Sequence, residues 1–198
     1  MPKQTPSQTV GPFFAYGLTP EAYGRVGVAG NNLLTDSTQG ERIRIEGVVY
    51  DGDGAPVSDA MLEIWQANAA GRYDHPEDTR NEVAADPGFH GFGRTGTDAE
   101  GRFSFDTVKP GPVPGRGNSL QAPHVSLTLF SRGMPNHTFT RIYFPDETDA
   151  NAADPVLALA PADRRETLVA TRLDRSGQPV YRFDIHLQGE QETVFFDA

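Results

Sequence analysis

Turn-forming residues divide this chain into short apolar segments, and this spacing limits the folds that the chain can adopt. The 198 residues include 21 glycines and 16 prolines, which are spread along the sequence and form no repeat. The tetrapeptide Asp-Gly-Asp-Gly at 51–54 ends one apolar segment. It is a strong turn, because Gly and Asp tolerate the positive φ that hairpins need. Short apolar segments between such turns are typical of an all-β sandwich.

The segment 124–129 shows the alternation of a β-strand most clearly. Val125, Leu127 and Leu129 share one face, and the polar side chains between them share the other. We predict one helix, at 162–171, with Asp163 in an early position that favours a negative charge. Further strands are predicted at residues 43–50, 61–66, 102–107, 138–144, 181–187 and 193–196.

Two segments lack the periodicity of helices and strands. Residues 1–40 are expected to form an extended, irregular arm that packs on a partner chain, whereas residues 41–198 are expected to form one β-sandwich domain. Residues 74–93 are predicted to form a long loop, and long ordered loops in a sandwich are often functional.

Charge and composition limit the classes of partner, compartment and chemistry that suit this chain. The formal net charge of −10 disfavours nucleic acid as a partner, because such a surface repels phosphate backbones. No apolar run approaches the roughly 20 residues that span a bilayer, and residues 1–5 lack a signal core, so a cytoplasmic location is expected. The absence of cysteine excludes thiolate chemistry. An anionic substrate would need a local cation on this acidic chain.

The region 45–73 contains a set of motifs whose spacing resembles the signature of the intradiol ring-cleavage dioxygenases. Its residues are Ile45, Gly47, Val49, Gly54, Val57, the run Leu-Glu-Ile-Trp-Gln-Ala at 62–67, and Gly-Arg-Tyr at 71–73. The similarity extends to the runs 5–13, 109–112, 122–124 and 181–185, and so to nearly the whole chain. The resemblance implies the transthyretin-like β-sandwich of this family, with an irregular N-terminal arm and one short helix.

The resemblance also implies a ferric site that is incomplete in this chain. Members of the family hold Fe(III) with two tyrosines and two histidines, and hard Fe(III) favours phenolate oxygen. The four matching positions are Tyr73, Val113, His124 and Ser126, which we call the vestigial site. A valine offers no donor atom and a serine is a poor substitute for imidazole, so two ligands of four remain and metal binding by this chain alone is not expected.

Three other histidines could replace the missing ligands: His75, His90 and His137. The first two follow Tyr73 in the predicted loop, and the third lies near a turn. We interpret all three as surface histidines.

Some members of the family consist of two homologous chains, of which the β chain carries Fe(III). The resemblance implies that this chain is the other one, and that its site is therefore incomplete. The substrates are then O₂ and a small aromatic catechol acid, 3,4-dihydroxybenzoate. In such a pair this chain lines the substrate pocket at the boundary, through residues that match Thr9, Gly11, Pro12, Phe13 and Arg132.

Elementary chemistry agrees with these assignments. Gly11 has no Cβ, so its backbone can approach a planar ring, and Pro12 pushes it towards an extended conformation. Arg132 offers the cation that a carboxylated substrate needs.

Two other interpretations compete with a two-chain dioxygenase. A homo-oligomeric catechol or hydroxyquinol dioxygenase typically adds a helical N-terminal segment, and residues 1–40 show no amphipathic helix. A non-catalytic transthyretin-like binding or assembly module has no need of Tyr73 or of the arm.

Overall fold

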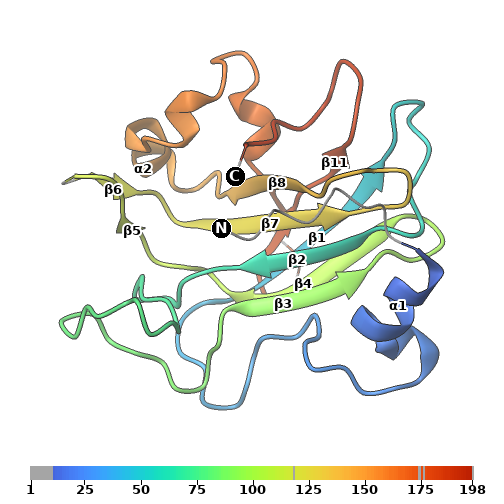
Figure 1. Ribbon diagram of the computed structural model, residues 1–198. Helices are drawn as coiled ribbons and strands as arrows, with labels where there is room; N and C mark the ends of the chain where they lie inside the picture. The colour runs from blue at the N-terminus through green and yellow to red at the C-terminus, as the bar shows by residue number, and fades with distance from the viewer. Residues whose placement is uncertain (1–10, 118, 174, 176, 198) are drawn as a thin grey trace, which may run out of the picture.

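The chain folds into two β-sheets that pack face to face (Figure 1). A computed structural model describes residues 11–117, 119–173, 175 and 177–197, and for Pro12 and Phe13 it describes the backbone alone. The predicted all-β sandwich is therefore confirmed. No helix among these residues is long and apolar enough to cross a membrane.

Strand β1 is the centre of the larger sheet and pairs with β4, β10 and β11. This sheet contains β1 (Arg42–Tyr50), β4 (Arg102–Val108), β9 (Thr171–Leu173), β10 (Val180–Arg182) and β11 (Ile185–His186). The second sheet has the order β3-β2-β7-β8, with β3 at Phe92–Gly96, β2 at Met61–Trp65, β7 at His124–Phe130 and β8 at Thr138–Tyr143. A small hairpin joins β5 (Val113–Pro114) to β6 (Leu120–Gln121).

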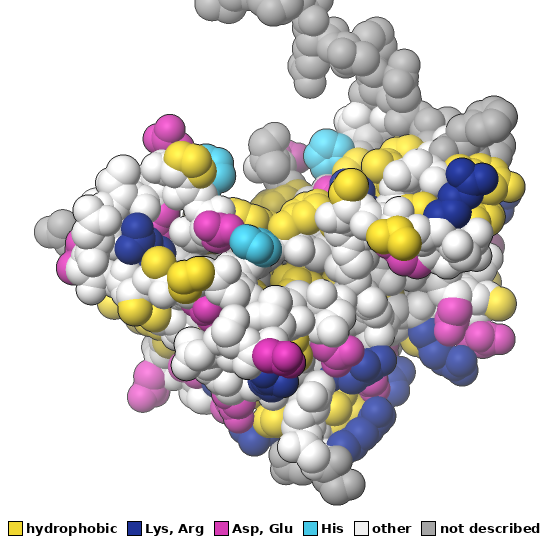
Figure 2. Space-filling view, turned by 90° about the horizontal axis from the view of Figure 1, so that it is seen from below, with side chains coloured by type: hydrophobic (Ala, Val, Ile, Leu, Met, Phe, Trp, Pro, Cys, Tyr) yellow, Lys and Arg dark blue, Asp and Glu magenta, His cyan; other side chains and the backbone are white. Residues whose placement is uncertain are grey.

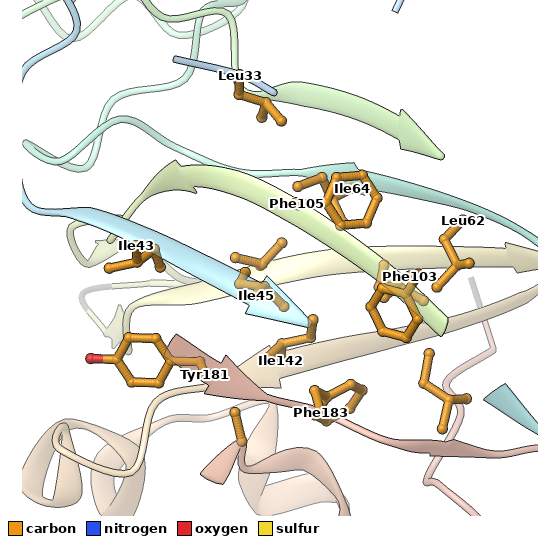
Figure 3. Close-up of a cluster of buried hydrophobic side chains, with 14 of the residues drawn as sticks. Leu33, Ile43, Ile45, Leu62, Ile64, Phe103, Phe105, Ile142, Tyr181 and Phe183 are labelled. Carbon is orange, nitrogen blue, oxygen red and sulfur yellow. The ribbon is translucent and has the colours of Figure 1, made fainter. Parts of the chain in front are cut away.

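The core lies between the two sheets, where side chains from both inner faces meet (Figure 3). Val125, Leu127 and Leu129 of β7 are fully buried, as their alternation predicts. Full burial of such a side chain contributes about 1.5–3 kcal/mol. The inner face of β7 fixes its register, so its outer face carries His124 and Ser126 towards the loops.

Residues 30–33 pack against the same sandwich. Leu33 belongs to the core, and its backbone N–H donates to the carbonyl of Asp106 at 2.8 Å. Arg94 N–H donates to the carbonyl of Gly30 at 3.0 Å. The end of the N-terminal segment is thus hydrogen-bonded to the β3 and β4 edges.

Helical structure differs from the prediction. The predicted helix at 162–171 was wrong: a 3₁₀ turn at Arg165–Leu168 replaces it, and Thr171 already begins β9. Its backbone bonds are i→i+3, as from Thr167 to Arg164, so no α-helical turn forms. Helices occur instead at α1 (Pro12–Leu18), α2 (Thr148–Ala153), and in 3₁₀ turns at Pro20–Tyr23 and Leu157–Leu159. The arm is therefore not irregular throughout, because Pro12 favours the first position of a helix.

Strand predictions held best in the centre of the sheets. The predicted strand 181–187 is divided into β10 and β11, because the carboxylate of Asp184 accepts the N–H of Val48 at 3.0 Å in place of a regular ladder bond. The predicted strand 193–196 was wrong, since Phe196 forms a single isolated bridge with Phe139. The loop prediction for 74–93 holds as far as 91, and β3 then begins at Phe92.

The two ends of β7 carry different structures. Figure 1 shows α1 beyond one end of the sheets, and α2 with the β5–β6 hairpin beyond the other. The ring of Phe14 in α1 lies 5.8 Å from the ring of Phe130, the last residue of β7, whereas His124 is its first residue. At about 3.3 Å per residue, these two ends are roughly 20 Å apart.

Candidate functional site

The vestigial site lies on the outer face of the smaller sheet, next to a pocket of about 680 Å³. Tyr73 and Val113 both line this pocket. The ring of Trp65, at the end of β2, stacks on the ring of Tyr73 with 5.7 Å between centroids. Trp65 also pairs across the strands with Ser126, and His124 precedes Ser126 by two residues on the same face of β7. The structure therefore brings all four predicted positions to one region.

A glycine contact holds Tyr73 close to Val113. Gly71 has φ +84°, and a Cβ on it would lie 2.1 Å from the carbonyl oxygen of Pro112. Only a residue without a side chain permits this approach of the loop after β2 to the turn before β5. The contact accounts for a glycine at position 71 of this chain.

An ion pair orders the loop that follows Tyr73. Asp78 accepts the N–H of Tyr73 at 2.8 Å and pairs with Arg80 at 2.5 Å. The hydrogen bond from Arg80 lowers the pKa of Asp78 to about 2. Arg80 also donates to the carbonyl of Gly71, so the loop closes on itself beneath the tyrosine.

His124 is buried and neutral at physiological pH. It is 4% exposed, and its Nδ1 lies 2.8 Å from the carbonyl oxygen of Ala122, to which it donates in the matching tautomer. Burial, aided by the positive charge of Arg141, lowers the pKa of His124 to about 4.

Tyr73 is half-buried, and burial raises the pKa of its hydroxyl. Arg141 and Arg80 oppose this effect without reversing it. Neither surviving ligand position therefore carries a negative charge, and both lie within the field of Arg141.

The remaining residues do not fit a ferric ion. Val113 and Ser126 supply neither phenolate nor imidazole, and Arg141 lies directly opposite Ser126 in the pairing of β7 and β8. Among the residues that the structure describes, no group of three His, Asp or Glu side chains is arranged to hold a metal ion.

The three alternative histidines do not complete the site. His75 lines the pocket, but it is exposed and its Nδ1 accepts the N–H of Glu77 at 3.2 Å. His90 is exposed and pairs with Asp74 at 2.6 Å. His137 is exposed too, and its ring packs on Phe130 at the far end of β7. The interpretation of all three as surface histidines is confirmed.

The predicted substrate-binding residues lie at the α1 end of the sandwich. Thr9 is outside the described residues, and Pro12 and Phe13 are described by their backbone alone. Gly11 is extended, with φ −108° and ψ 175°, and no described atom lies within 4 Å of where its Cβ would be. The predicted effect of Pro12 on Gly11 is therefore observed.

Arg132 follows β7 by two residues, which places it near α1 and roughly 25 Å along the strand direction from His124. Its side chain is 80% exposed, and its Nε lies 2.8 Å from a carboxylate oxygen of Asp59. Figure 2 shows other basic side chains next to acidic ones on the face that it displays. The structure thus separates the vestigial site from the residues expected to meet substrate.

Sequence reasoning missed Arg141 and Gln121. Both residues lie in short β-strands and carry no motif of their own. Their position next to the vestigial site depends on which strands pair. The alternation of β8 could have placed Arg141 on its outer face, but the register opposite Ser126 is a nonlocal property.

Comparison with known proteins identifies the family. A family model described as "Dioxygenase" matches residues 11–189. The chain belongs to the intradiol dioxygenase family. The enzymes of this family use iron.

Curated relatives of this intradiol dioxygenase chain include both chains of one named enzyme. The protocatechuate 3,4-dioxygenase alpha chain of Burkholderia cepacia is 52% identical over 99% of this chain and 98% of its own length. The corresponding protein of Pseudomonas putida is 46% identical over 98% of this chain and 96% of its own length. The beta chain from Burkholderia cepacia is 40% identical over 82% of this chain and 71% of its own length.

Solved structures agree with the fold. The dioxygenase domain of a carbohydrate-binding fusion protein from a Streptomyces species aligns with a TM-score of 0.60 over 94% of this chain and 96% of that domain, at 23% identity. The 3-chlorocatechol 1,2-dioxygenase of Rhodococcus opacus aligns with a TM-score of 0.61 over 82% of this chain and 67% of its own, at 22% identity.

Proposed function

We propose that this chain is the α subunit of a protocatechuate 3,4-dioxygenase. In this proposal a homologous β chain binds Fe(III), and the complex uses O₂ to cleave 3,4-dihydroxybenzoate to 3-carboxy-cis,cis-muconate. One observation carries the proposal: the chain keeps the fold of the intradiol family, but two of the four metal-ligand positions hold residues that cannot serve as ligands, Val113 and Ser126. A chain of this kind needs a partner to take part in ring cleavage.

The relatives support the same assignment. Identity to the named alpha chain of Burkholderia cepacia is 52% over nearly the full length of both proteins, against 40% over a shorter region for the beta chain of the same organism. A pair of homologous chains would explain why this one could lose its metal ligands.

In the proposed complex, residues 1–40 act as an arm on the partner chain, and residues 41–198 form the sandwich. Side chains in the described part of the arm are unusually exposed for apolar residues. Tyr16, Tyr23, Val26 and Val28 are 53%, 45%, 98% and 100% exposed, respectively. A partner that covers them would remove this apolar surface from water.

This chain would bind and orient substrate through Gly11 and Arg132. The extended backbone at Gly11 leaves room for a flat ring to approach, and Arg132 supplies a cation for the substrate carboxylate. Asp59 would then hold the guanidinium until substrate replaces it. Thr9, Pro12 and Phe13 complete the proposed wall.

Expression of this chain alone and together with a β chain tests the proposal. The lone chain is expected to be colourless and inactive, and the complex to carry iron, tyrosinate-to-Fe(III) absorption and protocatechuate-dependent O₂ uptake. Iron per protomer, the visible spectrum and O₂ consumption are measured on the same samples. Ring cleavage by the lone chain would instead indicate a self-sufficient homo-oligomeric dioxygenase. A complex that forms without activity would indicate a binding or assembly module.

Substitution Arg132→Ala in the complex is expected to raise KM for protocatechuate about tenfold, which corresponds to the loss of one charge-assisted hydrogen bond. KM for catechol, which lacks the carboxylate, should change much less. Arg102→Ala is the matched control, because Arg102 is also exposed and paired with carboxylates but lies on β4. Equal increases of KM for the two substrates would contradict the role given to Arg132.

A further inference from the structure

Strand pairing places a guanidinium between the two positions that have lost their ligands. Val113 of β5 lies directly opposite Gln121 of β6, and Ser126 of β7 lies directly opposite Arg141 of β8. Residues directly opposite in an antiparallel pair project to the same face. The Nη1 of Arg141 donates to the Oε1 of Gln121 at 2.6 Å. This one hydrogen bond therefore links the strand partners of both lost ligands.

The hydrogen bond to Gln121 also brings the guanidinium towards the surviving ligand positions. Gln121 lines the same pocket as Tyr73 and Val113, and Ser126, directly opposite Arg141, lies two residues from His124 on one face of β7. Tyr143, two residues along β8, stands opposite His124, and their ring centroids are 5.9 Å apart. Arg141 thus lies on the same face of the sheet as Ser126 and His124 and bonds to a residue that lines the pocket with Tyr73 and Val113.

We infer that Arg141 occupies the place of the metal in this chain and excludes iron independently of the missing ligands. Arginine stays protonated under any condition that the protein meets, so the positive charge is permanent. A metal cation brought to Tyr73 and His124 would approach this charge in a partly desolvated site, where repulsion is poorly screened. The side chain also replaces the metal structurally, because it ties β8 to the β5–β6 hairpin through Gln121.

The inference goes beyond the proposed function, since it concerns this chain whether or not it pairs with a β chain. It states that rebuilding the ligands will not be enough to restore a metal site. Val113 lines a pocket of about 680 Å³, so a larger side chain at this position has space to extend towards Tyr73.

The test compares three variants of the full chain, each incubated with iron in air. All contain Val113→Tyr and Ser126→His. One keeps Arg141, the second adds Arg141→Gln, and the third adds Arg141→Lys as a control that keeps the charge. Glutamine retains an amide donor for Gln121 without the charge.

The Arg141→Gln variant is expected to bind iron at least about tenfold more tightly than the other two, with tyrosinate-to-Fe(III) absorption. Iron per chain and the visible spectrum are measured, with circular dichroism to verify folding. Equal binding when Arg141 is kept would overturn the inference, as would a folded Arg141→Gln variant that takes up no iron.

A second pair leaves Val113 unchanged, in case a tyrosine there prevents folding. Ser126→His is combined with Arg141→Gln or with Arg141→Lys, and Zn²⁺ binding is measured by calorimetry. Three protein ligands are enough for a zinc site with one open position. We expect at least about tenfold tighter binding for the glutamine variant. Equal affinities in this pair would exclude an effect of the charge and would refute the inference.

Discussion

Substitution Asp154→Ala is expected to lower the free energy of unfolding by about 3–5 kcal/mol, because it removes the acceptor of four hydrogen bonds in a buried network. Asp154 is 1% exposed and follows α2. Its carboxylate accepts hydrogen bonds from the backbone N–H groups of Ala122, Val156 and Leu157 and from the hydroxyl of Tyr143, at 2.7, 2.9, 2.7 and 3.0 Å. Alanine would leave four donors without this acceptor, and each buried unsatisfied donor costs about 1–3 kcal/mol.

The effect of Asp154 extends to the vestigial site. Ala122 also accepts the hydrogen bond of His124, and Tyr143 contacts the ring of His124. The carboxylate of Asp154 therefore joins the end of α2 to the segment just before β7 and to the last residue of β8. Loss of this junction is expected to loosen the region around Arg141 before the centre of the sandwich unfolds.

Urea unfolding of the purified chain measures the change. Asp154→Asn keeps one acceptor oxygen and should be destabilised by less than Asp154→Ala. Asp53→Ala removes an exposed carboxylate in a turn and should change stability by no more than about 0.5 kcal/mol. A difference below about 1 kcal/mol between wild type and Asp154→Ala would show that the network contributes little.

Local sequence patterns predicted the centre of the fold well because they depend on neighbours along the chain. The alternation of Val125, Leu127 and Leu129 identifies β7 without knowledge of its partners, since the period of a strand is two residues. The helix prediction for 162–171 failed because the structure of this segment depends on contacts with residues distant in the sequence. Its one buried residue within the 3₁₀ turn, Leu168, anchors it to the core through tertiary packing, which overrides a weak helical preference.

The vestigial site was predicted in part. Motif spacing located Tyr73 and His124 and also the two departures, Val113 and Ser126, because a family signature is a linear property. It did not reveal Arg141, whose significance comes from lying opposite Ser126 in the register of β7 and β8. A single sequence contains no information on that register beyond the alternation that both strands share.

The stability of the chain is expected to fall as the pH decreases from 7 to 5, in part through His124. Unfolded histidine binds a proton below its usual pKa of 6.5, whereas burial keeps the pKa of folded His124 at about 4. Between these values the unfolded state binds more protons, so acid favours unfolding. Arg141 adds to the effect by disfavouring a second positive charge, while Asp154 opposes it. The contribution is absent above pH 7 and complete below pH 4.

Comparison with His124→Gln isolates this contribution, because the other titrating groups are common to both proteins. Between pH 7 and pH 5, wild type should lose about 2 kcal/mol more stability than the variant, as linkage requires for this shift of the pKa. The measurement is urea unfolding at several pH values and constant ionic strength. Parallel pH profiles would show that His124 becomes protonated as easily in the folded chain as in the unfolded one. A steeper profile for wild type would instead establish that burial and the positive charge of Arg141 keep the imidazole of His124 neutral in the folded chain.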